Sequence, residues 1–227
     1  MSTLIDKTPP RQSVRRIPIK SFEGVRGVTP EGQGYESLLE CDYLTLLRFS
    51  PDVARFTAQP CTVAYAWGGK TRKYTPDVLV EFRRGDTGGA LRATELIEIK
   101  PSSIYAAGDP LMLAKFGAAT IHATEKGWIF RVVTEADMPA ARLENAKFLL
   151  RYLTRAIDGA YSQLVIDALG QYQQTTVESL IKMCQQSEQN RAQVLTEVWS
   201  LIAQRRIGAD LDDVLTMQSP LWSLEPQ

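Results

Sequence analysis

The sequence predicts an α/β protein in which a mixed β-sheet is flanked by helices and followed by a smaller, mostly helical domain. Two apolar runs on either side of a glycine-rich turn, between residues 74 and 100, indicate an antiparallel strand pair. Segments with helical spacing of apolar residues lie before and after this pair, at 35–49 and 111–124. Beyond residue 136 nearly every segment has helical spacing, and 227 residues of which 44% are hydrophobic can form two domains.

Residues 1–34 contain proline, glycine and basic residues without periodicity, which indicates an irregular basic arm. Its basic side chains are candidates for contact with DNA phosphates, because each such contact releases counterions. A solvated tail has the same composition, so both interpretations stay open. The candidates in this arm are Arg11, Arg15, Arg16 and Lys20.

The segment 35–49 is predicted to be a helix that ends before Pro51, because its apolar residues recur at helical spacing. Glu40 lies beside the apolar stripe formed by Leu39 and Tyr43, where a carboxylate requires a cation. We therefore treat Glu40 as a candidate third carboxylate of a metal site. The alternative is an ordinary exposed glutamate.

The next segments complete the strands that lead into the pair. Residues 53–56 and Gln59 are expected to form a connector, and 61–67 a strand that reverses at Gly68 and Gly69. The chain then continues as one strand over 72–82.

The strand pair brings ionisable side chains together. If the chain reverses between Thr87 and Gly88, Asp77 pairs directly with Glu98, and the alternation of side chains places Lys100 on the same face. The opposite face then carries the apolar residues of both strands. These core-facing residues are Val78, Val80, Phe82, Ile97 and Ile99.

Pro76-Asp77 followed by Glu98-Ile99-Lys100 matches the PD-(D/E)xK nuclease signature. Two neighbouring carboxylates favour a hard divalent cation, so we expect Mg²⁺, with Mn²⁺ able to substitute. Lys100 would orient the attacking water or hold a phosphate oxygen. The alternative is a solvated hairpin with surface charges, but the apolar residues on both sides of Glu98 disfavour it.

A helix over 111–124, with Asp109 as its cap, and a short buried strand over 128–133 follow. The order helix, three strands, helix, strand is that of the restriction-endonuclease-like fold. We assign residues 35–136 to this nuclease domain.

The segment 137–227 is predicted to be a winged-helix-like domain. It contains helices over 143–157, 161–169, 177–184 and 191–204, followed by a hairpin of 205–212 with 221–224. Such a domain either presents a helix to a DNA groove or contacts another protein. Arg205 and Arg206 are its candidate DNA-binding residues.

Composition excludes several other chemistries. Lys plus Arg and Asp plus Glu are equal at 26 each, so any basic surface is local. One histidine and three scattered cysteines argue against a zinc site, a disulfide framework and a histidine-dependent nuclease. We expect no secretion signal and no membrane span, and a cytoplasmic location close to the bacterial nucleoid.

Four separated motifs resemble the TnsA family, the endonuclease subunits of Tn-seven-like transposases. They are residues 40–53, then 56–60, then 74–77, and finally 98–100. The resemblance implies that Glu40, Asp77 and Glu98 hold the metal, that Lys100 is the catalytic lysine and that Gln59 lies near the site. Some family members carry glutamine at the position of Glu98.

The resemblance also implies a substrate and partners. It implies cleavage of double-stranded DNA at the 5′ ends of the transposon. A DDE-type transposase, TnsB, would cut and join the 3′ ends, and an AAA+ protein, TnsC, would regulate both. Two alternatives remain, namely a stand-alone restriction or repair endonuclease and a non-catalytic DNA-binding assembly protein.

Overall fold

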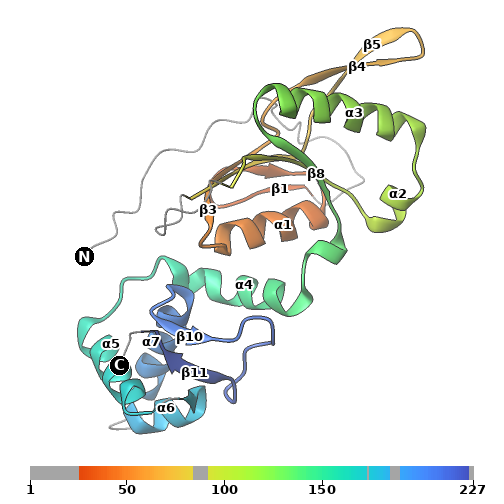
Figure 1. Cartoon of the computed structure of the whole chain (residues 1–227). Helices are drawn as coiled ribbons and strands as arrows, with labels where there is room; N and C mark the ends of the chain where they lie inside the picture. Colours follow the sequence, from red (N-terminus) through yellow and green to blue (C-terminus); the bar gives the residue numbers. More distant parts are fainter. Residues whose placement is uncertain (1–25, 84–91, 173, 185–189, 225–227) are drawn as a thin grey trace. The chain divides into compact units, whose positions relative to one another are not determined.

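A computed structural model describes residues 26–83, 92–172, 174–184 and 190–224 (Figure 1). The chain forms two compact units, Met1–Met138 and Pro139–Gln227, and the sequence placed the corresponding boundary at 136/137. Within the described ranges, no helix is long and apolar enough to cross a membrane.

The first unit is built on a four-stranded mixed sheet with the order β3-β6-β7-β8 (Figure 1). Its strands are β3 (Val53–Ala58), β6 (Val78–Phe82), β7 (Glu95–Ile99) and β8 (Ile129–Val133). The pairs β3–β6 and β6–β7 are antiparallel, whereas β7 and β8 are parallel. The parallel pair requires a crossover, which the helices between β7 and β8 supply.

The register of β6 and β7 is the one predicted from the sequence. Val78 pairs with Ile97 and Leu79 with Leu96, so Asp77 is the residue opposite Glu98. Val78, Val80, Ile97 and Ile99 are buried in one cluster, and Phe82 packs against it. The predicted division into a row of ionisable residues on one face and apolar residues on the other is confirmed. Further along the strands, the face that carries the ionisable residues is also apolar, because Leu79 and Leu96 lie there.

Helices cover both faces of this sheet (Figure 1). The helix α1 (Leu38–Phe49) packs Leu44 and Leu47 against the Val78–Ile97 face. The helix α3 (Pro110–Glu125) packs Ala123 against Leu79 and Leu96 on the other face. Asp109 caps α3 as predicted, because its side chain accepts hydrogen bonds from two backbone N–H groups of the first turn.

Short helices join the remaining parts of the first unit. They are α2 (Ser102–Ala106), between β7 and α3, and the 3₁₀ helix η1 (Glu135–Asp137), after β8. The edge strand β8 is less buried than predicted, with Ile129 54% exposed, because only β7 pairs with it.

Two predictions about the strands were wrong. Residues 53–58 form β3 rather than a connector, and the bidentate ion pair of Arg55 with Glu81 on β6 accounts for the polar residue within an otherwise apolar strand. The predicted strand 72–82 is broken into β5 (Lys70–Tyr74) and β6, because Pro76 has no N–H to donate to a ladder. The strand β5 pairs with β4 (Val63–Trp67) in a separate two-stranded ribbon.

The described end of the predicted irregular arm is a small hairpin. The strands β1 (Gly27–Val28) and β2 (Gly34–Tyr35) pair in antiparallel fashion. The side chain of Gln33 accepts a hydrogen bond from the backbone N–H of Ala58, which ties this hairpin to β3. The candidate residues Arg11, Arg15, Arg16 and Lys20 lie outside the described residues.

The second unit consists of helices with a three-stranded sheet of order β10-β11-β9. The helices are α4 (Ala140–Leu153), α5 (Gly159–Gly170), α6 (Val177–Cys184) and α7 (Arg191–Ala203), and the strands are β9 (Thr175–Thr176), β10 (Ile207–Ala209) and β11 (Pro220–Ser223).

The hairpin predicted after the last helix is present as β10 and β11, and β9 is a strand that the sequence did not indicate. Gly208 is required in β10, because a Cβ atom there would lie 2.1 Å from the indole nitrogen of Trp222. The assignment of a winged helix stays a prediction.

Candidate active site

Three oxygen-bearing side chains lie in one row across the ends of three neighbouring strands. Ala58 pairs with Val78, and Val78 pairs with Ile97. The next positions along these strands are Gln59, Asp77 and Glu98. Backbone hydrogen bonds continue the ladder here, from Gln59 N–H to Asp77 O at 2.7 Å and from Asp77 N–H to Ile97 O at 3.0 Å.

Asp77 is held at the centre of this row. Its Oδ2 accepts a hydrogen bond of 2.7 Å from the backbone N–H of Ile99. Part of the residue faces a cleft, but protein atoms surround the carboxylate. This burial raises the pKa of Asp77 well above its ordinary value, the negative charge of Glu98 adds to the rise, and Lys100 opposes it. An ionised Asp77 therefore requires more positive charge than the protein supplies.

Glu98 is buried, with 4% of its surface exposed. Its Oε1 lies 2.7 Å from the Nζ of Lys100, and its Oε2 accepts a hydrogen bond of 2.5 Å from the hydroxyl of Tyr74. Both oxygens of this buried carboxylate thus have a partner. Burial and the charge of Glu98 together raise the pKa of Tyr74, so this hydroxyl keeps its proton and acts as a donor.

Lys100 lies between the two carboxylates and the backbone. Its Nζ also donates to the carbonyl oxygen of Ile99 at 3.3 Å. Burial lowers the pKa of Lys100, but the negative charges of Asp77 and Glu98 outweigh it, so the pKa is raised. The ammonium group is therefore a fixed positive charge beside the carboxylate row.

Gln59 has two features that are unusual for a glutamine. Its φ is 48°, a conformation that costs a non-glycine residue free energy, and only 7% of its surface is exposed. Its Nε2 donates to Oε1 of Glu36 at 3.0 Å, whereas its buried Oε1 accepts no hydrogen bond from the part of the chain that the structure describes. A buried acceptor without a donor is costly, so this oxygen suits a ligand that enters the cleft.

Glu40 lies close to the row but has a different set of contacts. Its Oε2 accepts from the backbone N–H of Glu36 at 2.7 Å and its Oε1 from the hydroxyl of Ser37 at 2.9 Å, while Ser37 in turn caps the helix. Burial raises the pKa of Glu40, and these hydrogen bonds reduce the rise. Glu36, one turn earlier, lines the cleft together with Asp77 and Glu98, whereas Glu40 does not.

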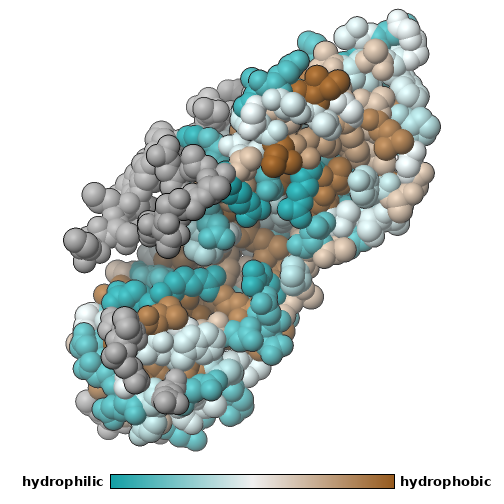
Figure 2. Space-filling view, viewed as in Figure 1, coloured by the Kyte–Doolittle hydropathy of each residue, from teal (hydrophilic) through white to brown (hydrophobic). Residues whose placement is uncertain are grey.

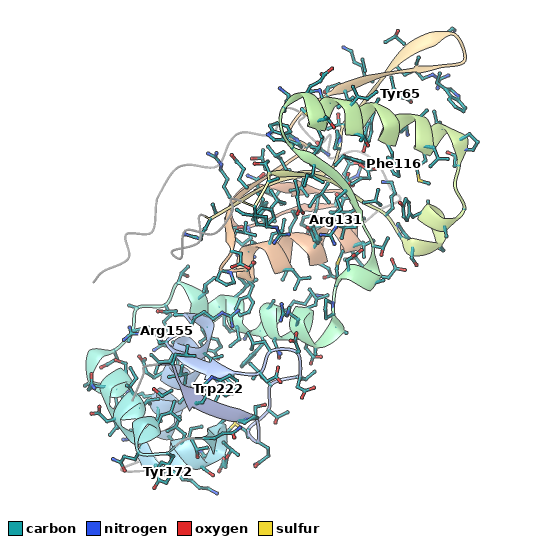
Figure 3. The ribbon with its side chains drawn as sticks, in the orientation of Figure 1. Tyr65, Phe116, Arg131, Arg155, Tyr172 and Trp222 are labelled. Carbon is teal, nitrogen blue, oxygen red and sulfur yellow. The ribbon has the colours of Figure 1, made fainter. Side chains whose placement is uncertain are left out.

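These residues form one wall of an open cleft of about 730 Å³. The other walls come from the β4–β5 ribbon and from α3, which carry Tyr65 and Phe116, labelled in Figure 3. The cleft contains cations as well as acids, since Lys73 and Lys115 also line it. A cleft lined by both carboxylates and cations is suited to a substrate with phosphate groups.

Comparison with known protein families identifies the chain. The model described as TnsA-like endonuclease N terminal matches residues 50–135, and the model described as TnsA endonuclease C terminal matches residues 137–211. The chain belongs to the TnsA-like endonuclease family. It is thus a nuclease of the kind that acts on DNA as the endonuclease subunit of a Tn-seven-like transposase. A comparison with functionally curated proteins found no match.

The family match agrees with a restriction-endonuclease-like fold for the first unit. It also favours the transposase interpretation over a stand-alone restriction or repair enzyme and over a non-catalytic assembly protein.

The TnsA-like site contains hard oxygen donors that suit a divalent cation. In the part of the chain that the structure describes, no three Asp, Glu, His or Cys side chains already converge enough to hold a metal ion. The carboxylates of Asp77 and Glu98 are nevertheless side by side, and the buried amide oxygen of Gln59 has no donor. Oxygen ligands of this kind are those that Mg²⁺ prefers, so the residues are compatible with the expected ion.

The structure does not bring all predicted site residues together. Asp77, Glu98, Lys100 and Gln59 line one cleft, and Glu40 is not among the residues that line it. Arg205 and Arg206 belong to the second unit, in the turn between α7 and β10.

Sequence reasoning did not find two groups of this TnsA-like site. The sequence motif contains Tyr74 but does not predict its hydrogen bond to Glu98, which depends on how the ribbon packs on α3. The row position of Gln59 was not predicted, because the connector expected at this point is the strand β3 in the structure. The sequence pattern that indicates this strand is the mostly apolar segment 53–58, directly before Gln59 and Pro60.

Proposed function

We propose that this endonuclease uses Mg²⁺ to hydrolyse a phosphodiester bond at the 5′ ends of a Tn-seven-like transposon. In this proposal it acts on double-stranded DNA together with a TnsB-type transposase and a TnsC-type AAA+ regulator. The observation that carries the proposal is the row of Gln59, Asp77 and Glu98 with Lys100 beside it, inside a cleft that also contains Lys73 and Lys115.

Asp77 and Glu98 are the proposed metal ligands, with the amide oxygen of Gln59 as a further oxygen donor. When bound, a divalent cation polarises the scissile phosphate, lowers the pKa of the attacking water and stabilises the leaving oxygen. Glu40 lies near enough to influence the pKa of Asp77, and its carboxylate supports the α1 end of the site through Ser37.

The chain's own side chains carry the remaining steps. Lys100 supplies a fixed positive charge to a non-bridging phosphate oxygen, where negative charge increases in the transition state. Tyr74 keeps one oxygen of Glu98 in place, which orients the other oxygen towards Lys100. In the reaction, the water loses a proton to the solvent, its oxygen bonds to phosphorus, the bond from phosphorus to a deoxyribose oxygen breaks, and that oxygen takes up a proton from the solvent.

The metal proposal can be tested without activity. Calorimetric titration with Mn²⁺ is expected to give weak binding to the wild type and none to Asp77→Ala. Leu113→Ala, an exposed residue of α3 that does not line the cleft, is a suitable control. Equal Mn²⁺ binding by Asp77→Ala and the wild type would remove Asp77 from the site.

The proposed role in transposition requires the partners. A duplex carrying a transposon end, and a random duplex, are incubated with Mg²⁺ and the chain, with or without the transposase and the ATPase from the same element. We expect cutting of one strand at each end, only in the complete mixture, and no cutting there with Lys100→Ala. Sequence-specific cutting of both strands by the chain alone would instead support a restriction-type enzyme.

A further inference from the structure

The β4–β5 ribbon, residues 63–74, is a separate structural arm of the first unit. Among the described residues its two strands pair only with each other, from Val63 opposite Tyr74 to Trp67 opposite Lys70. The turn consists of Gly68 and Gly69, both with positive φ and no atom within 4 Å of an added Cβ. Figure 1 shows the ribbon extending beyond the central sheet, next to α3.

The base of the ribbon is fixed and its outer part is exposed. Val63, Tyr65 and Tyr74 are buried in a cluster with Ala119 of α3. In contrast, Ala64 and Ala66 and the first four residues of β5 are exposed. In Figure 2 the outer end of the ribbon is white to teal, the colours of intermediate and hydrophilic residues. A rigid base with a polar outer part is suited to contact a polar partner.

The ribbon carries unbalanced positive charge. Between Cys61 and Pro76 the sequence contains Lys70, Arg72 and Lys73 and no acidic residue, in a chain whose formal net charge is zero. All three side chains are exposed. Within the described ranges, none of the three forms an ion pair or a hydrogen bond through its side chain. A local concentration of free cations attracts a polyanion.

The positively charged strand β5 ends next to the row of Gln59, Asp77 and Glu98. Tyr74, the last residue of β5, donates its hydroxyl hydrogen bond to Glu98, and the preceding Lys73 lines the same cleft. The five residues of β5 span about 16 Å, which corresponds to about five nucleotides of one strand of a duplex. A backbone whose scissile phosphate lies at Glu98 and Lys100 would therefore pass along the ribbon.

The shape of the ribbon also suits a duplex. Ala64 pairs with Lys73 and Ala66 with Thr71, so one face combines small side chains with a cation. Small side chains allow a sugar–phosphate backbone to approach closely. A two-stranded ribbon is, in addition, narrow enough to enter the major groove of DNA.

We propose that the β4–β5 ribbon holds the duplex beside the active site, with Lys73 contacting a phosphate from one face of the ribbon and Lys70 and Arg72 contacting phosphates from the other. The inference rests on the proposed function, since it assigns the ribbon to the same DNA substrate. Lysines on an exposed strand also prevent association with other sheets, which is the competing explanation for these charges. That explanation predicts aggregation of an uncharged ribbon and unchanged DNA binding.

The test compares the triple variant K70A/R72A/K73A with the wild type. Binding of a short fluorescent duplex of mixed sequence is measured by anisotropy in EDTA over a range of low salt concentrations. Loss of three phosphate contacts is expected to make the slope of log K against log salt less steep by about 2.7. The control K126A/K147A/R151A removes the same charge from exposed positions elsewhere and is expected to change the slope by less than about 1.

A second variant separates charge from side-chain shape. K70R/R72K/K73R keeps three cations and is expected to bind with the slope of the wild type, because phosphate contacts here depend on charge. Circular dichroism and thermal melting show whether each variant folds. Equal slopes for K70A/R72A/K73A and the control, or no duplex binding by the wild type at any salt concentration, would overturn the proposal.

The outcome for the ribbon is distinguishable from that for the proposed function. If the slopes are equal but the complete transposition mixture still cuts at transposon ends, the ribbon proposal fails and the proposed function stands. If the slopes differ as expected but the complete mixture never cuts, the ribbon binds DNA and the proposed function fails.

Discussion

Replacing Asp77 with asparagine is expected to stabilise the metal-free protein while removing the proposed metal site. Asp77 is surrounded by protein and lies opposite Glu98, and the positive charge of Lys100 does not cancel the rise in its pKa that burial and Glu98 cause. Asparagine keeps an oxygen that can accept the 2.7 Å hydrogen bond from Ile99 N–H and carries no charge. Functional sites often retain such a destabilising charge because the activity requires it.

The size of the expected stability change, and its dependence on pH, follow from the raised pKa of Asp77. Each unit by which folding raises a pKa costs about 1.4 kcal/mol at a pH above both values. In a chain of this size, 1 kcal/mol shifts Tm by about 2–4 °C, so each unit corresponds to about 3–6 °C. Because the folded state binds the proton more tightly, wild-type stability falls as the pH rises from the ordinary value of about 3.9 to the raised one. At pH 7.5 we expect the Tm of Asp77→Asn to be several degrees higher than that of the wild type. Near pH 4 we expect the two proteins to have the same Tm.

The assay is thermal melting in EDTA at both pH values, followed by melting with Mn²⁺. A ligand at 100 times its Kd stabilises a protein by about 2.7 kcal/mol, and only the wild type should gain this. Asp137→Asn is a matched control for which the opposite change is expected. The backbone N–H of Thr134 lowers the pKa of Asp137, so losing the Asp137 carboxylate should destabilise the protein above that pKa. A lower Tm for Asp77→Asn at pH 7.5, or a difference independent of pH, would refute the reasoning.

Three further predictions concern other residues. Lys100→Ala should keep the fold but reduce the rate of cleavage by the complete mixture by a factor of about 10² or more. Lys100→Arg should restore this rate only in part, because the guanidinium group is planar. Wild-type cleavage rates in both variants would mean that Lys100 has a structural role only. Tyr74→Phe removes the donor to Glu98 and should cost about 1–3 kcal/mol in urea unfolding, and an unchanged midpoint would mean that this hydrogen bond is not formed in solution. Asn145→Ala removes hydrogen bonds to Leu211 O, Asp213 O and Leu215 N–H, so it should destabilise the second unit by about 2–4 kcal/mol; hydrogen exchange that stays slow around 211–215 would contradict this.

Local patterns in the sequence were sufficient to predict a large part of the fold. The register that places Asp77 opposite Glu98 could be predicted because side chains alternate strictly along a strand, so only one pairing puts the apolar residues of both strands on the same face. The cap of α3 by Asp109 and the bounds of α6 could be predicted because these are interactions within one or two helical turns. Each of these features depends on residues close together in the chain or on a single strand pair.

The composition of the site depended on contacts between distant segments. Gln59 joins the row only because β3 pairs with β6, and the hydrogen bond of Tyr74 to Glu98 requires the ribbon to pack on α3. Glu40 could be placed beside the apolar stripe from its spacing, but its carboxylate is directed by Ser37 and the helix N-terminus. Sequence patterning determines which side chains share a face, because that is a property of backbone geometry. Only the tertiary structure decides which of them meet a partner, because that depends on how segments far apart in the chain bury their apolar surfaces together.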